Sequence, residues 1–235
     1  MSDLLKVRAD SLVVSEIFGP TFQGEGRSIG RRAAFLRLGL CNLTCTWCDT
    51  PYTWDWQHHD PQDELRRRDL ASVAREIREL RVDLLVVSGG EPLLQQLALA
   101  GLFAMLDGME IEIETNGTVR PSAAITELVE RFTVSPKLAN SAVREGKRIN
   151  ATALEAFAGN GKSVFKFVAS GPTDLIEIRR LVDRFELGNV YVMPEGTSAD
   201  RVVEGMRRLA GEVLANGWNL TPRLHVLLWD DRRAV

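Results

Sequence analysis

One buried strand that runs into two glycines and an acid constrains the fold of this chain more than any other feature. Residues Val82 to Val87 form a nearly continuous apolar run, and Ser88-Gly89-Gly90-Glu91-Pro92 follows at once. Such a run is typical of a strand that is covered on both faces, as in a parallel sheet. Glycines at the carboxyl end of a buried strand allow close approach to the backbone, and ligands bind at that end of parallel sheets.

Strands and helices alternate along the whole chain. After Asp69, a candidate N-cap, the apolar residues Leu70, Val73, Ile77 and Leu80 recur at helical spacing on one face. We expect strands at 12–18, 33–38, 82–87, 110–114, 132–134, 163–168, 189–192 and 223–228, and helices at 70–80, 93–106, 123–131, 151–157, 174–185 and 199–215. This alternation predicts an α/β fold whose parallel sheet has helices outside.

Polar or glycine-rich segments follow several of these strands, at Ser88, Thr115, Ser135 and Met193. They should share one rim, as in a barrel site, but there are only about six strand–helix units against the eight of a full barrel. We therefore expect an abbreviated, open (β/α)6-type partial barrel. No repeat or linker interrupts the chain, which predicts a single domain over residues 1–235.

All cysteines of the chain lie in Cys41-x3-Cys45-x2-Cys48. Packing gives no reason for such clustering, a disulfide would leave one thiol over, and three thiolates on a short loop suit a soft metal. A structural zinc would need a fourth ligand, for which His58 or His59 is available. An iron–sulfur cube is usually held by four cysteines, so three would leave one iron open for chemistry.

Two further features lie close to this loop. The glycine-rich segment Gly19 to Gly26 is expected to be irregular, either a surface turn or a ligand loop with Gln23 and Glu25 as polar groups. Arg37 is four residues before the first cysteine, so a role in a site competes with a solvated position. Tyr52, Trp54 and Trp56 follow the loop as a candidate lid over the metal.

Composition excludes several classes of protein. A formal net charge of −3 gives no electrostatic reason to bind nucleic acid. No stretch is apolar for the roughly 20 residues that a bilayer span needs. The odd, clustered cysteines and the absence of a signal-peptide pattern predict a reducing, cytoplasmic location.

The cysteine spacing resembles the signature of radical S-adenosylmethionine (SAM) enzymes, and Gly89-Gly90-Glu91-Pro92 resembles their second motif. Further blocks are similar to the 7-carboxy-7-deazaguanine synthase family, and with the tail at 223–229 they cover nearly the whole chain. These blocks are Phe18 to Gly26, Phe35 to Gly39, Cys48 to Tyr52, Glu114 to Thr118 and Ser135 to Lys137.

The resemblance implies a partial barrel of the radical SAM kind and a lyase of queuosine and 7-deazapurine biosynthesis, a pathway of tRNA modification. Such an enzyme converts 6-carboxy-5,6,7,8-tetrahydropterin to 7-carboxy-7-deazaguanine with loss of ammonia. A 4Fe–4S cluster would reduce SAM, and the 5′-deoxyadenosyl radical would take hydrogen from C6 of the pterin, so no protein residue is the catalytic radical. The resemblance further implies Mg²⁺, a homodimer and a reductase such as flavodoxin or ferredoxin as partner.

The resemblance also implies roles for single residues. Cys41, Cys45 and Cys48 would hold the cluster, and Thr50 would bind Mg²⁺ through a hard oxygen. The implied SAM contacts are Trp47, Cys48, Asp49, Gly90, Glu91, Ser135, Pro136, Lys137, Val192, Met193, Pro194 and Glu195. The implied substrate contacts are Phe22, Gln23, Gly24, Glu25, Arg37, Ser88 and Val235, and Glu114 is a further site acid. Arg37 suits this role, since a guanidinium forks onto a carboxylate.

Two alternatives stay open at this point. A radical SAM enzyme of another kind, such as a glycyl-radical activase, has similar cysteine spacing but leaves Gln23-Gly24-Glu25 and Asp49-Thr50 unexplained. A zinc-stabilised binding module would use the cysteines and a histidine, but it has no need of Gly89-Gly90-Glu91-Pro92.

Overall fold

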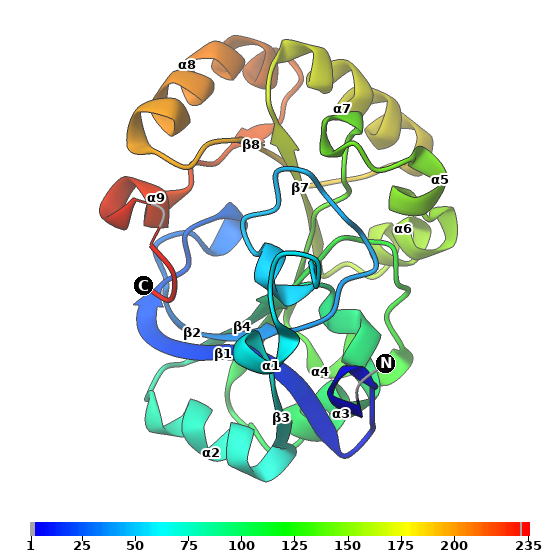
Figure 1. Cartoon of the computed structure of the whole chain (residues 1–235). Helices are drawn as coiled ribbons and strands as arrows, with labels where there is room; N and C mark the ends of the chain where they lie inside the picture. Colours follow the sequence, from blue (N-terminus) through cyan, green and yellow to red (C-terminus); the bar gives the residue numbers. More distant parts are fainter. Residues whose placement is uncertain (1–2, 231) are drawn as a thin grey trace. The chain divides into compact units, whose positions relative to one another are not determined.

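The structure of the chain is a computed structural model that describes residues 3–230 and 232–235. The chain divides into two compact units. The first unit comprises Met1–Thr21, Arg32–Thr115 and Pro121–Arg131, and the second comprises Phe22–Arg31, Asn116–Arg120 and Phe132–Val235. Each unit is an open sheet with helices packed on it (Figure 1).

The strands of the first unit lie in the order β3-β1-β2-β4-β5. Their bounds are β1 (Ser11–Phe22, of which Phe22 belongs to the second unit), β2 (Arg32–Leu38), β3 (Arg66–Asp69), β4 (Leu84–Gly89) and β5 (Glu110–Thr115). β3 runs antiparallel to β1, whereas β2, β4 and β5 are parallel. The carboxyl ends of β2 and β4 therefore meet at one edge, where the cysteine loop and the glycines begin.

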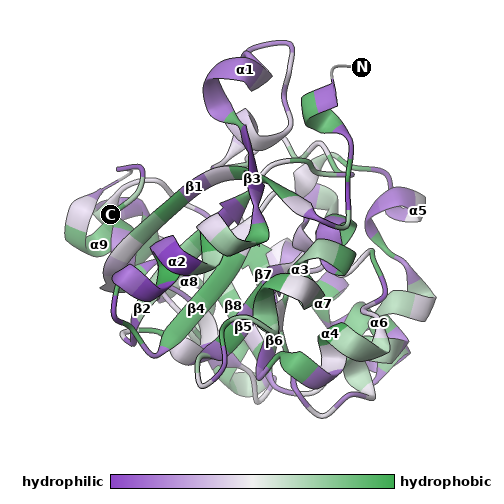
Figure 2. Cartoon of the chain, turned by 90° about the horizontal axis from the view of Figure 1, so that it is seen from below, coloured by the Kyte–Doolittle hydropathy of each residue, from purple (hydrophilic) through white to green (hydrophobic). Residues whose placement is uncertain are grey.

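Helices cover the sheet of the first unit. Their bounds are α1 (Pro61–Glu64), α2 (Leu70–Glu79), α3 (Gln96–Phe103) and α4 (Ala123–Leu128). The side chain of Asp69 accepts a hydrogen bond from Ser72 N (2.9 Å), which confirms the expected N-cap of α2. Residues 84–87 of β4 are almost completely buried, and Figure 2 shows this strand in the green of apolar residues. The expectation of a strand covered on both faces is confirmed.

The strands of the second unit lie in the order β6-β7-β8-β9 and are parallel. Their bounds are β6 (Arg131–Val134, of which Arg131 belongs to the first unit), β7 (Ser163–Ala169), β8 (Val190–Pro194) and β9 (Asn219–Leu220). The helices are α5 (Glu145–Arg148), α6 (Ala151–Ala158), α7 (Pro172–Phe185), α8 (Ala199–Ala215) and α9 (Leu224–Trp229). The core includes Phe132 and Phe157, whose rings meet edge to face at 5.3 Å.

The expected α/β fold with an open, partial-barrel sheet is confirmed. The alternating strand–helix order is carried by β2, β4 and β5 in the first unit and by β6, β7 and β8 in the second. In the part of the chain that the structure describes, no helix has the length and apolarity to cross a bilayer.

Two local expectations are wrong. The strand expected at 223–228 is the helix α9, because a short apolar run such as Leu224 to Leu228 fits either element. The segment from Gly19 was expected to be irregular, yet β1 continues to Phe22. Gly19 has a φ of +140°, and a Cβ there would lie 3.0 Å from Ala33 O, so the strand needs a glycine where it passes β2.

Candidate active site

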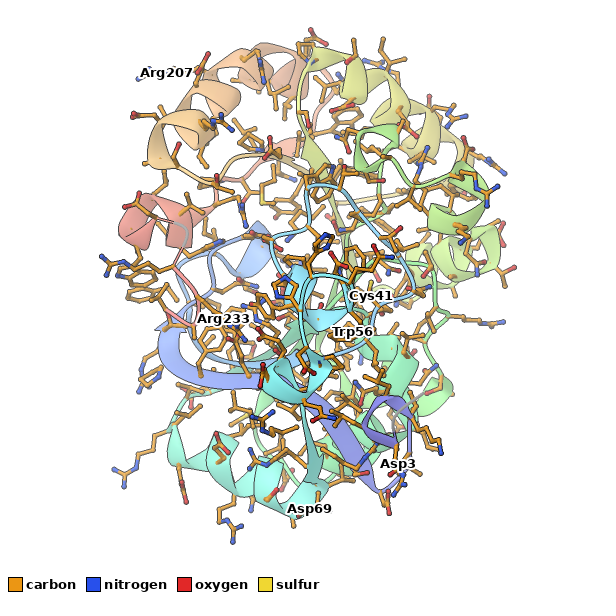
Figure 3. All side chains as sticks on the ribbon, in the orientation of Figure 1. Asp3, Cys41, Trp56, Asp69, Arg207 and Arg233 are labelled. Atoms are coloured by element: carbon orange, nitrogen blue, oxygen red, sulfur yellow. The ribbon has the colours of Figure 1, made fainter. Side chains whose placement is uncertain are left out.

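The cysteine loop leaves the carboxyl end of β2 in the first unit. Cys41, Cys45 and Cys48 form no disulfide; Cys45 is buried and the other two are partly exposed. Figure 3 labels Cys41 and Trp56, which come from this loop and from the segment that follows it. Three thiols on one loop, none of them in a disulfide, supply soft donors of the kind that hold an iron–sulfur cluster.

N–H groups donate to the sulfurs of Cys41 and Cys48. Leu43 N donates to Cys41 Sγ (3.4 Å), and Trp54 Nε1 donates to Cys48 Sγ (3.3 Å). Burial raises the pKa of the Cys41 thiol to about 12, and the charge of Glu91 adds to this rise. A metal binds the thiolate, so occupation of this loop must release that proton.

The segment after β4 packs backbone to backbone against the start of the cysteine loop. Gly90 N donates to Leu38 O (3.0 Å), and Glu91 N donates to Leu40 O (2.8 Å). A Cβ at Gly90 would lie 2.0 Å from Leu40 O and 3.0 Å from Cys41 Cβ. The two motifs are 40 residues or more apart in the chain, but they are in direct contact in the structure. Only glycine fits at position 90, between their backbones.

Glu91 has no exposed surface, and its carboxylate is held by neighbouring donors. Its Oε1 accepts from Leu93 N (3.0 Å) and from Thr115 Oγ1 (2.8 Å). Thr115 ends β5, so the expected rim of polar groups after successive strands exists in this unit. The acid is fixed beside the cysteine loop, where it can accept a hydrogen bond from an ammonium group of a ligand.

Arg37 and Ser88 are direct neighbours in the sheet, because β2 and β4 pair them in register. Both therefore stand at the edge from which the cysteine loop and the glycines leave. Arg37 Nε donates to Glu16 Oε2 (2.8 Å), and Ser88 is buried. An arginine beside a serine hydroxyl can bind a carboxylate.

Thr50 follows the cysteine loop and is buried. Its Oγ1 lies 3.7 Å from Cys48 Sγ, and its carbonyl oxygen accepts from Thr53 Oγ1 (2.8 Å). The hydroxyl is a hard donor of the kind that Mg²⁺ binds. Trp47 and Asp49, the other expected contacts in this segment, are partly exposed and exposed, respectively.

The histidines near the loop contact carboxylates rather than thiols. His58 Nδ1 lies 2.7 Å from Asp55 Oδ2, and His59 Nδ1 lies 3.9 Å from Glu64 Oε1. Among residues 3–230 and 232–235, no three His, Cys, Asp or Glu side chains converge as the ligands of one metal ion do. In a cluster each cysteine binds its own iron, so convergence on one point is not required.

The second unit holds the expected substrate loop, Phe22 to Glu25. Gln23 is buried, and its backbone pairs with Gly30 and Arg31. Gly24 O accepts from Leu224 N (2.8 Å), and a Cβ at Gly24 would lie 2.2 Å from His225 Nδ1. The start of α9 is therefore packed directly on this loop.

A cluster of buried charges surrounds Glu25. Its Oε2 is paired with Lys166 Nζ, and its Oε1 lies 3.3 Å from Arg223 Nε and 3.9 Å from His225 Nε2. Burial alone raises the pKa of the Glu25 carboxyl, but the positive charges around it, Lys166 above all, outweigh burial and hold it well below its ordinary value. Glu25 is thus ionised and anchors the loop to β7 and α9.

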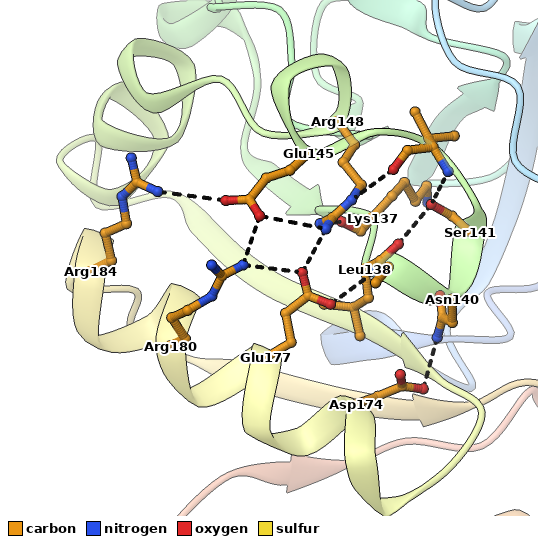
Figure 4. Close-up of polar contacts among 12 residues, drawn as sticks. Lys137, Leu138, Asn140, Ser141, Glu145, Arg148, Asp174, Glu177, Arg180 and Arg184 are labelled. Carbon is orange, nitrogen blue, oxygen red and sulfur yellow. Dashed lines mark hydrogen bonds and ion pairs between the residues drawn. The ribbon is translucent and has the colours of Figure 1, made fainter.

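The segment Ser135 to Lys137 follows β6 and is held by another ionic network (Figure 4). Arg148 Nη1 donates to Lys137 O (2.7 Å), and Arg148 Nη2 pairs with Glu177 Oε1 (2.8 Å). Glu177 Oε2 in turn accepts from Ala139 N (2.8 Å). Other expected contacts of this unit lie at the end of β8, where Val192, Met193 and Pro194 are buried and Glu195 is partly exposed. Val235, the last expected contact, is also partly exposed.

Several residues that shape these segments were not found by sequence reasoning. They are Glu16, Lys166, Arg223, Arg148 and Glu177. Lys166 lies between Phe165 and Phe167 in an otherwise apolar strand. This charge within an apolar run was the one sequence signal that pointed to a buried ion pair. A lysine in a covered strand has to be paired.

Comparisons with known proteins agree with this geometry. Residues 37–145 match the model of the radical SAM superfamily. The chain is 35% identical to 7-carboxy-7-deazaguanine synthase of Pyrobaculum aerophilum, with 94% of this chain and 96% of the relative covered. It is 31% identical to the synthase of Halobacterium salinarum, with 94% and 91% covered. The crystal structure of QueE from Escherichia coli has the same fold, with a TM-score of 0.71 at 24% identity over 94% of this chain and 97% of that one.

Proposed function

Because the chain belongs to the 7-carboxy-7-deazaguanine synthase family, we propose that it converts 6-carboxy-5,6,7,8-tetrahydropterin to 7-carboxy-7-deazaguanine with loss of ammonia. The chain is a radical SAM lyase of 7-deazapurine biosynthesis, so the family implies a 4Fe–4S cluster and SAM. The observation that carries the proposal is the direct packing of Gly90 and Glu91 on the start of the cysteine loop.

Cys41, Cys45 and Cys48 would hold the cluster, and Glu91 and its neighbours would hold SAM. When bound, the cluster supplies the electron that cleaves SAM into the radical that starts the reaction. The Glu91 carboxylate would accept from the methionine ammonium group, and its burial and its bond from Leu93 N support this role. The other SAM contacts that we propose are Trp47, Cys48, Asp49, Gly90, Ser135, Pro136, Lys137, Val192, Met193, Pro194 and Glu195.

Arg37 and Ser88 would bind the pterin, with Arg37 on its carboxylate. Their register in the sheet supports this pairing. We further propose Phe22, Gln23, Gly24, Glu25 and Val235 as substrate contacts, with Glu25 acting mainly by anchoring the loop. Thr50 would bind Mg²⁺ on the substrate.

The remaining proposals concern the protein as a whole. Residues 1–235 would act as one catalytic domain in a cytoplasmic homodimer. A one-electron reductase such as flavodoxin or ferredoxin would reduce the cluster. Neither nucleic acid nor a membrane is needed by this chemistry.

Anaerobic assay of the reconstituted protein tests the proposal. Wild type should be brown, cleave SAM and form 7-carboxy-7-deazaguanine from the carboxylated pterin, whereas Cys45→Ala should lose colour and turnover. Thr50→Ala, assayed with and without Mg²⁺, separates the metal's role from that of the cluster. A brown protein that cleaves SAM but forms no deazaguanine would contradict the proposed substrate and favour a radical SAM enzyme of another kind.

A further inference from the structure

The guanidinium of Arg37 is held on one side by an acid and on its face by an aromatic ring. Arg37 Nε donates to Glu16 Oε2 at 2.8 Å, and both side chains are largely buried, at 18% and 12% exposed. The guanidinium carbon lies 5.5 Å from the centre of the Phe18 ring, which stacks on Phe35 at 5.0 Å. Glu16 and Phe18 both lie on β1, adjacent to the strand that carries Arg37.

These contacts engage only part of the guanidinium. Within the described ranges, Glu16 is the only group that accepts a hydrogen bond from Arg37, and it does so at Nε. A guanidinium carries five N–H donors in a planar fork, four of them on the two terminal nitrogens. The bond at Nε and the ring on its face fix the plane of the guanidinium, and this fixes the direction in which the two terminal nitrogens point.

We propose that Glu16 is a positioning residue that orients Arg37, and that it thereby makes the site select a carboxylated pterin over the same pterin without a carboxylate. The inference rests on the proposed function, because Arg37 must be the group that binds the substrate carboxylate. Glu16 acts through geometry rather than charge. Its negative charge faces the same guanidinium as the substrate and, taken alone, would weaken the attraction of Arg37 for an anion.

Two variants of Glu16 separate geometry from charge. Glu16→Gln removes the charge but keeps an acceptor at the same distance from Nε. Glu16→Asp keeps the charge but is one methylene shorter, so it withdraws the acceptor from Nε. Glu76→Asp is the matched control, because Glu76 also pairs with an arginine at 2.8 Å but is 42% exposed and belongs to the surface pair with Arg68.

The measurement is equilibrium binding of two ligands, 6-carboxytetrahydropterin and tetrahydropterin, to anaerobic reconstituted enzyme with SAM and no reductant. Without reductant there is no turnover, so affinity is read directly. Glu16→Asp should weaken binding of the carboxylated ligand about 10-fold, as expected for one displaced charge-assisted contact. Glu16→Gln should stay within about threefold of wild type, since its amide oxygen is still an acceptor. Tetrahydropterin should bind equally to all variants, and Glu76→Asp should match wild type.

Thermal unfolding and iron content of each variant show whether it is folded and loaded. Equal losses for both ligands in Glu16→Asp would show a purely structural role and overturn the inference. So would an undiminished carboxylate preference in Glu16→Asp, or a loss in Glu16→Gln as large as in Glu16→Asp. If wild type shows no preference for the carboxylated ligand, the proposed function of Arg37 fails. If wild type shows the preference but the Glu16 variants keep it, only the role of Glu16 fails.

Discussion

The candidate site segments of the two units are held in place by different forces. In the first unit the cysteine loop is fixed by backbone contacts, with Gly90 and Glu91 donating to the carbonyls that precede Cys41. In the second unit the expected substrate loop also has backbone hydrogen bonds, but Glu25 on this loop and the segment around Lys137 depend on buried ion pairs as well. Backbone contacts do not titrate, whereas ion pairs depend on charge and therefore on pH. The difference predicts which changes each unit tolerates.

The largest effect should come from a side chain placed between the backbones of the first unit. In Gly90→Ala the new Cβ would lie 2.0 Å from Leu40 O, a backbone atom that cannot move without the cysteine loop. We expect a loss of stability on the order of 4 kcal/mol and failure to take up iron. Denaturant unfolding and iron analysis measure both.

Gly211→Ala in α8 is the control for this substitution. A Cβ at Gly211 meets nothing within 4 Å, and an alanine within a helix is favoured over glycine by up to about 1 kcal/mol. This variant should be as stable as wild type or more stable, with full iron content. A Gly90→Ala protein that loads iron normally would show that backbone contact does not hold the loop.

The second effect should come from removing a charge in the second unit. Glu25→Gln leaves Lys166 and Arg223 buried without their counter-charge, at 6% and 8% exposed. We expect a loss of about 3 kcal/mol at pH 7. Glu145→Gln, which removes an acid that is 43% exposed, should leave the stability close to that of wild type.

The pH dependence of the same variant gives the sign of the effect. The pKa of Glu25 is lowered in the folded protein from its ordinary value of 4.5, so its contribution is complete above that value and is lost as the pH falls further. The stability difference between wild type and Glu25→Gln should be constant from neutral pH to about pH 5 and should shrink in more acidic solution. Urea unfolding at a series of pH values measures it. A difference that stays constant at acidic pH would mean that the pair is not ionic.

The contrast between local backbone contacts and long-range ion pairs also explains what the sequence could predict. The cysteine loop and the Gly89-Gly90-Glu91-Pro92 segment are local patterns whose residue types carry their chemistry, and parallel strands bring their ends to one edge. The partners of Glu25 could not be predicted, because Lys166 and Arg223 are 141 and 198 residues away in the chain. One sequence contains no periodicity that links charges over such distances.

The third effect tests whether the ion pairs of the second unit influence the affinity for SAM as well as stability. Glu177→Gln weakens the pair with Arg148, which holds Lys137 O (Figure 4). We expect a loss of about 2 kcal/mol and roughly 10-fold weaker SAM binding. Arg184→Ala is the control, because Arg184 is 54% exposed and its 3.8 Å pair with Glu145 lies at the surface, where ion pairs contribute little. Unchanged SAM affinity in a destabilised Glu177→Gln protein would confine the network to folding.

The smallest effect should come from the hydrogen bond that a side chain of the first unit donates to a cysteine sulfur. Trp54 Nε1 donates to Cys48 Sγ, and hydrogen bonds to sulfur stabilise the more negative, reduced state of a cluster. Trp54→Phe keeps an aromatic ring but removes the donor, so the reduction potential should fall by tens of millivolts, on the order of the 59 mV that makes a tenfold change for one electron. Trp56→Phe is the control, because within the described residues no hydrogen bond joins the Trp56 ring to a cysteine. Spectroscopic redox titration of the reconstituted proteins separates the two. An equal shift in both variants would point to altered solvent access over the loop and would remove the hydrogen bond from the explanation, leaving the backbone as the support of this unit's site.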